Sequence, residues 1–326
     1  MIRVFKVDGD RLKELEKLSD LNPETDTGWI DLVSPTAAED SAVEDFLKIS
    51  VPTKEDMQEI EPSNRLYDED GADYMTMTAV AQVHLEDPVK APVTFIIFGN
   101  TLVTIHYSEL MSFSQYIIKA QKKNGVSIAS PHALMIDITE SFINRIADSL
   151  EALGSEIDQL SSDIFGSKKV TIKRKTNMLQ SAIRKVGAKG DLLSLLRESL
   201  TTITRMMLHH SLLVAAPEQK GMKFKMNSLN RDVIALNDHA SFMSNKMTFL
   251  LEATLGMINL EQNQIIKIFS IAAVVFLPPT LVASVYGMNF HHMPELDAIY
   301  GYPLAILAMI ISGILPLFYF KKKGWL

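Results

Sequence analysis

A stripe of small polar side chains runs along the C-terminal part of the sequence. Its members follow one another in alternating steps of four and three residues: Glu252, Gly256, Asn259, Asn263, Ile266, Ser270, Ala273, Leu277, Thr280 and Ser284. This spacing places them on one face of an α-helix. Such a face can line a water-filled pore, and its two large apolar residues, Ile266 and Leu277, would then form rings that gate the pore by dewetting.

The same stripe also fits close helix packing, because Gly, Ala, Ser and Thr are enriched where helices meet inside a membrane. The two asparagines, Asn259 and Asn263, favour the pore. Large apolar residues that lipid or neighbouring helices would cover flank the stripe: Ile265, Phe269, Val275, Phe276 and Leu281.

The stripe extends into the first of two segments able to span a membrane. Residues 268–288 and 299–320 contain no charged side chain, and at 1.5 Å per residue each segment crosses a hydrocarbon core of about 30 Å. The linker between them is too short to fold independently, so the sequence predicts a transmembrane hairpin. A buried hairpin of a soluble protein is the alternative, and the lysines adjoining each apolar block argue against it.

The lysines also predict the orientation. Lys267 precedes the first span and Lys321, Lys322 and Lys323 follow the second, whereas the linker has no Lys or Arg. Basic residues stay on the cytoplasmic side. We therefore expect a multi-pass protein of the inner or plasma membrane with both termini cytoplasmic.

Composition excludes several functions. The formal net charge of −7 argues against nucleic acid as a partner. The absence of cysteine excludes disulfides, thiolate metal sites and thiol catalysis. The N-terminus is charged and shows no signal peptide. No nucleophile–base set or nucleotide-binding loop is present, so the sequence predicts that the chain is not an enzyme.

The N-terminal third of the sequence predicts an α/β domain over residues 1–107. We expect strands at 1–7, 28–33, 73–84, 93–98 and 101–107, the last two joined by a turn at Gly99-Asn100. A helix is expected from Ser34-Pro35-Thr36 to about Lys48, because Pro and acidic residues favour its first turn.

Helices dominate the remainder. Residues 108–220 predict a helical hairpin, with one helix from Pro131 to Phe165 and a second from Lys168 to about Val214. A long stalk helix over 221–289 continues into the first span, with a break at Gly256 as the alternative. It carries a heptad seam of apolar and small residues: Leu229, Val233, Leu236, Ala240, Met243, Met247, Leu250, Thr254 and Met257. An extracytoplasmic loop (290–298), a second span (299–320) and a basic cytoplasmic tail (321–326) complete the chain. We expect a local kink or unwinding at Pro278-Pro279.

The end of the first span carries a specific motif. Tyr286-Gly287-Met288-Asn289 is followed by Met293-Pro294-Glu295-Leu296, after a span that contains Pro278-Pro279. With the basic tail, this segment resembles the CorA family of magnesium channels. The resemblance implies an α+β cytoplasmic domain, long α-helices and a two-helix transmembrane hairpin, assembled as a funnel-shaped homopentamer. It also implies uptake of Mg²⁺, with Co²⁺ and Ni²⁺ as further ions.

By the same resemblance, Gly287, Met288 and Asn289 form the selectivity filter. Mg²⁺ gives up its waters reluctantly, and a ring of neutral carbonyls and carboxamides can hold the hydrated ion without stripping it. Met288 is expected to brace this ring. Asn263, Leu277 and Thr280 match pore-lining positions of the family. Glu295 in the loop either concentrates cations or is a solvated acid.

Cytoplasmic Mg²⁺ bound between subunits holds channels of this family closed. Carboxylates that face one another across an interface repel until a dication bridges them. The candidates are acids of the predicted cytoplasmic part: Glu86, Asp87, Asp232, Asp238 and Glu252. Each is also explained as an ordinary surface acid.

Two other functions stay open at this point. One is a zinc or cobalt/nickel transporter on the same scaffold; the retained Gly287-Met288-Asn289 and Met293-Pro294-Glu295-Leu296 motifs favour magnesium. The other is a non-conducting sensor anchored in the membrane, against which the polar stripe argues.

Overall fold

The structure is a computed structural model that describes residues 1–59, 61–83, 87–125, 130–166, 172–213, 220–289, 293–294 and 298–324. The chain forms two compact units. The first comprises Met1–Gly166 and Ala182–Leu250, and the second comprises the described residues of Ser167–Ser181 and Leu251–Leu326. Helix α6 (Lys220–Tyr286) contributes to both units.

Seven strands of the described residues form one mixed sheet in the order β2-β1-β3-β7-β6-β5-β4. Neighbours are antiparallel except β3 and β7, which are parallel. The strands are β1 (Ile2–Asp8), β2 (Arg11–Leu15), β3 (Gly28–Val33), β4 (Leu66–Glu69), β5 (Ala72–Ala81), β6 (Val89–Phe98) and β7 (Thr101–His106).

Two tight turns set the register of the antiparallel part. Gly99 has a φ of 54° in the predicted turn between β6 and β7, a backbone conformation that glycine adopts without strain. Asp70 and Gly71 both have positive φ between β4 and β5, as a type I′ hairpin requires. The hairpin at Gly99-Asn100 is thus confirmed.

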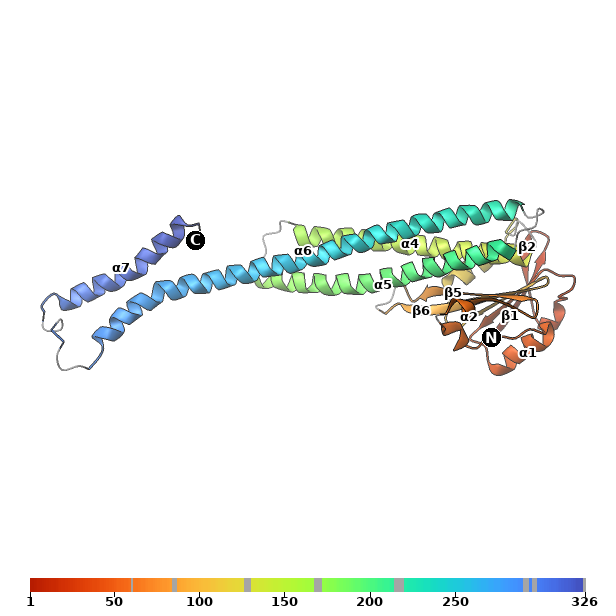
Figure 1. Ribbon diagram of the computed structural model, residues 1–326, viewed down its shortest axis with the longest axis horizontal. Helices are drawn as coiled ribbons and strands as arrows, with labels where there is room; N and C mark the ends of the chain where they lie inside the picture. The colour runs from red at the N-terminus through yellow and green to blue at the C-terminus, as the bar shows by residue number, and fades with distance from the viewer. Residues whose placement is uncertain are drawn as a thin grey trace. The chain divides into compact units, whose positions relative to one another are not determined.

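Helices cover both faces of the sheet (Figure 1). On one face, α1 (Ala37–Leu47) and the single turn η2 (Asp56–Gln58) enclose an apolar core that includes Ile30, Leu32 and Ile105. On the other face, α3 (Met111–Ala120) and α4 (Pro131–Phe165) pack against the strands. Trp29 is fully buried there and stacks on Phe5. The remaining short elements are η1 (Leu18–Asp20) and α2 (Pro62–Arg65).

Three long helices lie side by side in the first unit (Figure 1): α4, the part of α5 (Ile172–Leu213) from Ala182 onward, and the first part of α6. Lys189 of α5 pairs with Glu156 of α4 at 2.5 Å, and His132 of α4 meets His210 of α5 at 2.9 Å. Residue numbers rise in one helix as they fall in the other, so α4 and α5 are antiparallel. This confirms the predicted helical hairpin.

Helix α6 runs parallel to α4. Lys225 contacts Asp137 at 2.5 Å and Glu140 at 2.8 Å. Further along both helices, Lys246 pairs with Asp158. The predicted heptad seam lies inward, with Leu229, Val233, Ala240, Met243, Met247 and Leu250 all buried. The seam is therefore used within one chain, against α4 and α5.

In the second unit, the rest of α6 forms a hairpin with α7 (Gly301–Lys322). Among the described residues, these two helices are long and apolar enough to cross a membrane. Helix α6 stays helical through Gly256, which confirms the single helix. It also stays helical through Pro278 and Pro279, so the expected unwinding is absent.

The two spanning helices contact each other at Gly313. A Cβ added to Gly313 of α7 would lie 3.4 Å from Cγ of Pro279 and 3.5 Å from the carbonyl oxygen of Val275. Pro279 has no N–H to donate to that carbonyl. The close approach of α7 therefore falls where α6 lacks an internal hydrogen bond.

Candidate functional site

The polar stripe lies on the side of α6 that α7 leaves uncovered. In the second unit, α7 covers a narrow strip of α6, where Ile271 is 8% exposed and Val275, Pro278, Pro279 and Val282 are partly buried. Successive residues turn by about 100° around a helix. The predicted pore-lining residues therefore project about 100° to 180° away from the middle of this strip, and all of them are exposed: Asn263, Ile266, Ser270, Ala273, Leu277, Thr280 and Ser284.

Exposure alone does not distinguish this face from the lipid-facing one. Phe269 and Phe276 are 73% and 70% exposed, as expected for side chains that contact lipid. The distinguishing feature is chemistry: hydroxyl, carboxamide and small side chains gather on one strip, and only Ile266 and Leu277 interrupt it. Both are more than half exposed in one copy of the chain.

Thr280 shows how a hydroxyl on this face is oriented. Its Oγ1 donates a hydrogen bond to the carbonyl oxygen of Phe276 at 2.7 Å, within the same helix. The single hydroxyl proton is thereby used. The oxygen lone pairs remain available as acceptors, which is the polarity that the water shell of a cation requires.

The predicted filter residues follow directly after the last turn of α6. Gly287 N–H donates to the Ala283 carbonyl at 3.0 Å, and Met288 N–H donates to the Val285 carbonyl at 3.3 Å. A Cβ on Gly287 would lie 3.2 Å from the Ala283 oxygen, which is tighter than most real contacts. Met288 is 46% exposed and Asn289 is exposed, so neither is packed within one copy.

The end of α6 adds a favourable charge. The last carbonyls of a helix point along its axis and give its C-terminus about half a negative charge. Asn289 follows this end, so its carboxamide and the carbonyls just before it present oxygen atoms to the same region. Glu295 lies outside the described residues.

The regulatory candidates do not form a metal site within one copy. Glu86 lies outside the described residues, while Asp87, Asp232, Asp238 and Glu252 are all exposed. No group of three or more His, Asp or Glu side chains able to hold a metal occurs in the part of the chain that the structure describes.

The sequence did not predict a polar network buried beneath the sheet. Thr104 donates to Asp31 at 2.7 Å and accepts from the Trp29 indole at 2.9 Å. His106 lies 3.2 Å from Asp31 and stacks on Phe113. The one sequence signal for this network was Asp31, an acid within the otherwise apolar strand β3.

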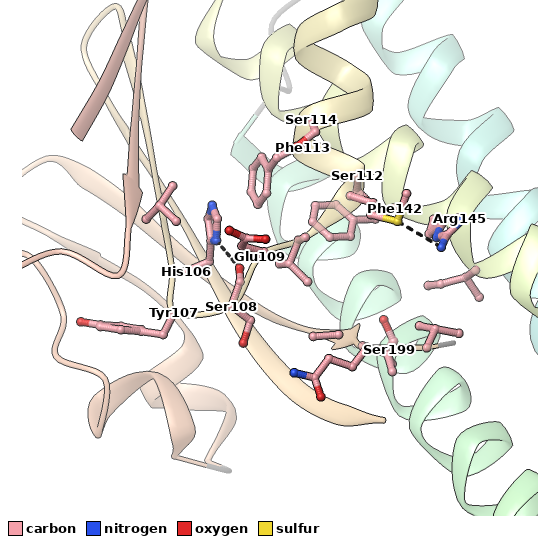
Figure 2. Close-up of a pocket in the computed structure, with 18 of the residues that line it drawn as sticks. His106, Tyr107, Ser108, Glu109, Ser112, Phe113, Ser114, Phe142, Arg145 and Ser199 are labelled. Atoms are coloured by element: carbon pink, nitrogen blue, oxygen red, sulfur yellow. Dashed lines mark hydrogen bonds between the residues drawn. The ribbon is translucent and has the colours of Figure 1, made fainter. Parts of the chain in front are cut away.

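This network borders a hollow of about 820 Å³ between the sheet, α3, α4 and α5 (Figure 2). Figure 2 shows His106 hydrogen-bonded to the Ser108 carbonyl, at 2.7 Å, and Arg145 donating to the sulfur of Met111. The first bond joins the end of β7 to the loop before α3, and the second joins α3 to α4. The network therefore helps to position α3 and α4 on the sheet.

The fold and the uncovered polar face define a class of protein: a large soluble α+β and helical region attached to two C-terminal helices that can span a membrane. Comparison with known families then identifies the group within this class. The family described as "CorA-like Mg2+ transporter protein" matches residues 24–322. The chain belongs to the CorA family.

Individual relatives agree with this assignment. The chain is 33% identical over 326 residues to the magnesium transport protein CorA of Escherichia coli (strain K12), covering 100% of both chains. It is 35% identical over 327 residues to the protein of the same name from Pectobacterium atrosepticum, again covering 100% of both.

A solved structure shares the fold. The complete structure of the CorA magnesium transporter from Methanocaldococcus jannaschii matches with a TM-score of 0.80 at 19% identity, covering 100% of this chain and 99% of that one. The predicted resemblance is thus confirmed, and so is the predicted fold of an α+β domain, long helices and a two-helix hairpin. Membership of a transporter family also confirms that the chain is not an enzyme.

Proposed function

We propose that this chain carries Mg²⁺ across the membrane as one subunit of a ring-shaped channel. The observation that carries the proposal is the polar face of α6, which lies opposite α7 and is uncovered in one copy. Family membership and the names of the full-length relatives support Mg²⁺ as the ion.

A ring follows from the geometry of two spanning helices. A single hairpin cannot enclose a polar path, because lipid would contact the polar face wherever α7 does not cover it. Several copies that turn this face toward a shared axis remove that cost. The family resemblance supports five copies, a homopentamer.

We place the selectivity filter at Gly287, Met288 and Asn289. Hydrated Mg²⁺ would contact the Asn289 carboxamides and the carbonyls at the end of α6, which are neutral and therefore release the ion readily. The partial negative charge of each helix end adds attraction without a fixed carboxylate. Glu295 in the following loop would concentrate cations near the entrance.

Below the filter, the path would follow the polar face toward the cytoplasm. Ser284, Thr280, Ala273, Ser270 and Asn263 would contact water around the ion. Ile266 and Leu277 would form two apolar rings that close the path when they dewet.

Transport needs no nucleotide hydrolysis. A charge crossing a potential of 100 mV gains about 2.3 kcal/mol, so a divalent cation entering a negative interior gains about twice that. Lys267, Lys321 and Lys322 adjoin the spans and support cytoplasmic termini in the inner or plasma membrane. The potential then drives Mg²⁺ inward.

Regulation by cytoplasmic Mg²⁺ would require acids from neighbouring copies. Asp87, Asp232, Asp238 and Glu252 are exposed, as an interface between copies requires, and Glu86 adjoins Asp87 in sequence. A dication bridging such acids would hold the ring closed.

Uptake by liposomes tests the proposal. The full chain is reconstituted with an inside-negative potential, and a fluorescent indicator reports Mg²⁺ entry. Asn289→Ala should lower the rate about tenfold or more, since 1.4 kcal/mol of lost ion stabilisation is already a factor of ten. Asn230→Ala, at an exposed position in the soluble part of α6, is the matched control.

Three outcomes would contradict parts of the proposal. Equal uptake by Asn289→Ala and the control would reject the filter. A monomer in native mass measurements from lipid would reject the ring. Uptake of Zn²⁺, Co²⁺ or Ni²⁺ with no uptake of Mg²⁺ would reject the ion.

A further inference from the structure

A second hollow in the first unit, of about 680 Å³, is lined by basic side chains. It lies where η2, α2 and the edge of the sheet meet α5. The basic side chains of its lining are Arg65, Lys90 and Arg205, and the single acidic side chain of the lining is Glu198. The lining therefore carries two net positive charges, in a chain whose overall formal charge is −7. This concentration of positive charge needs an explanation.

Sheet topology places the hollow. Strand β4 pairs with β5 only as far as Leu66 opposite Met75, so the outer edge of β5 is open beyond that point. Helix α5 closes it: Thr78 N–H donates to the Thr202 hydroxyl at 3.0 Å. The hollow lies beside this junction and takes residues from both the sheet and α5.

Arg65 is held rigidly in the hollow. Its Nε donates to the Glu59 carbonyl at 2.5 Å, and its Nη1 donates to the Thr78 hydroxyl at 3.1 Å. A guanidinium has five N–H donors in a planar fork. The acceptors of these two bonds are neutral, and further N–H donors of Arg65 remain for a ligand.

Arg205 adds a second guanidinium from α5. The only acid of the lining is already engaged, because both oxygens of Glu198 contact Lys90, at 2.8 and 2.6 Å. No carboxylate in the described parts of the chain forms an ion pair with Arg65 or Arg205. Burial lowers the pKa of Arg65, nearby Glu198 raises it, and the like charge of Arg205 lowers it again.

Two guanidinium groups that line one hollow, neither of them in an ion pair with a carboxylate of the described residues, favour an anion with several oxygen atoms. Phosphate fits this requirement, because its oxygens accept the paired donors of an arginine fork. The volume exceeds that of phosphate alone and lies within the usual range for a small-molecule pocket. Met57, Leu66 and Pro92 supply an apolar wall for an organic part.

We propose that this hollow binds a phosphorylated small molecule, with its phosphate between Arg65 and Arg205 and its organic part against Met57, Leu66 and Pro92. The ligand would bridge the sheet and α5. The proposal is independent of ion transport, because every residue involved belongs to the first unit.

Calorimetry and thermal melting of the full chain in detergent, in metal-free buffer, test the proposal with AMP as the probe. AMP should bind and raise the melting temperature, whereas adenosine, which lacks the phosphate, should do neither. Arg205→Gln should weaken AMP binding about tenfold, the effect of one charge-assisted contact. Arg205 is exposed, so this variant should fold normally.

Matched variants make the result specific. Arg197→Gln removes an exposed arginine of α5 that does not line the hollow, and it should bind AMP as the parent does. Asn289→Ala should also bind AMP normally, which separates this proposal from the filter. Dioctanoyl phosphatidic acid tests a lipid source: binding of this lipid, weakened by Arg205→Gln, would keep the phosphate site and assign it to a headgroup.

Two results would overturn the proposal. One is the failure of AMP, inorganic phosphate and the phosphatidic acid to bind at millimolar concentration. The other is AMP binding that Arg205→Gln and Arg65→Gln leave unchanged in proteins whose circular dichroism matches the parent.

Discussion

The two parts of α6 bury apolar side chains but leave different kinds of surface exposed. In the first unit its apolar seam faces α4 and α5, with Val233 and Ala240 fully buried, and charged residues face outward. In the second unit its large apolar residues face outward, with Phe269 73% exposed. Among these exposed apolar residues lies the polar strip, which α7 does not cover.

The difference reflects what surrounds each part. In water, burying apolar area stabilises the bundle by about 25 cal/mol per Å². In lipid this gain is absent, and small residues and polar contacts decide which helices associate. Different forces thus stabilise the two parts of one helix.

The largest expected effect comes from exchanging leucine for serine in each part. Leu229→Ser, at a buried seam position, should lower the free energy of unfolding of the first unit by about 3–5 kcal/mol, since it leaves a cavity and buries a hydroxyl. Leu277→Ser, at a 65% exposed position, should leave the melting temperature nearly unchanged and increase ion leak. Equal thermal destabilisation by the two variants would contradict the comparison.

A smaller effect is expected at the contact between the spanning helices. Gly313→Val should force α7 away from Pro279 and the Val275 carbonyl, at a cost of about 1–3 kcal/mol. Gly154→Val in α4 has open space around the new side chain and should be nearly neutral. Thermal melting in detergent measures both. If Gly313→Val were as stable as Gly154→Val, glycine would not be required for close packing.

The histidine pair of the bundle predicts a dependence on pH. Burial, then the neighbouring His132 and His209, lowers the pKa of His210 from 6.5 to about 3. The unfolded chain therefore binds a proton at this residue that the folded chain does not, and stability should fall as the pH drops from 6.5 toward 3.

At pH 5 this loss should be about 2 kcal/mol relative to pH 7, from 1.36 kcal/mol per pKa unit. His210→Gln should flatten the difference between melting temperatures at pH 7 and pH 5. His239→Gln, at an exposed histidine of α6, should keep it. An unchanged pH profile in His210→Gln would show that other groups govern acid sensitivity.

The smallest effect is expected from removing single hydroxyls in the membrane. Ser284→Ala on the polar face of α6 should lower Mg²⁺ uptake about twofold to threefold, a change below 1 kcal/mol. Ser312→Ala in α7, where the hydroxyl donates to the Met309 carbonyl, should leave uptake unchanged. A larger loss of uptake in Ser312→Ala than in Ser284→Ala would indicate that α7, and not α6, lines the ion path.

Much of the fold follows from local signals in the sequence. Strand β3 and helix α4 have the predicted bounds. Helix α4 begins after Ser130, whose side chain accepts the Ala133 N–H, and ends before Gly166. Such caps act within one turn of the chain, so the sequence is sufficient to place them.

Strands β2 and β4 gave no clear signal, and helix α3 was not predicted although its buried residues Phe113, Tyr116, Ile117 and Ala120 have helical spacing. The two strands form the edges of the sheet and carry charged residues, as edge strands commonly do. Because each edge strand pairs with only one neighbour and is largely exposed, its sequence shows no apolar run. Helix α3 is held by packing against α4 and the sheet.

The sequence by itself determined the two apolar segments, the heptad seam and the periodic polar stripe, because each is a repeat along one helix. Only the tertiary structure decided which face of α6 is covered by α7, and it alone placed Arg65 and Arg205 around one hollow and brought His132 to His210. These contacts join residues far apart in the chain. Their energy depends on the packing of whole elements, which no local pattern encodes.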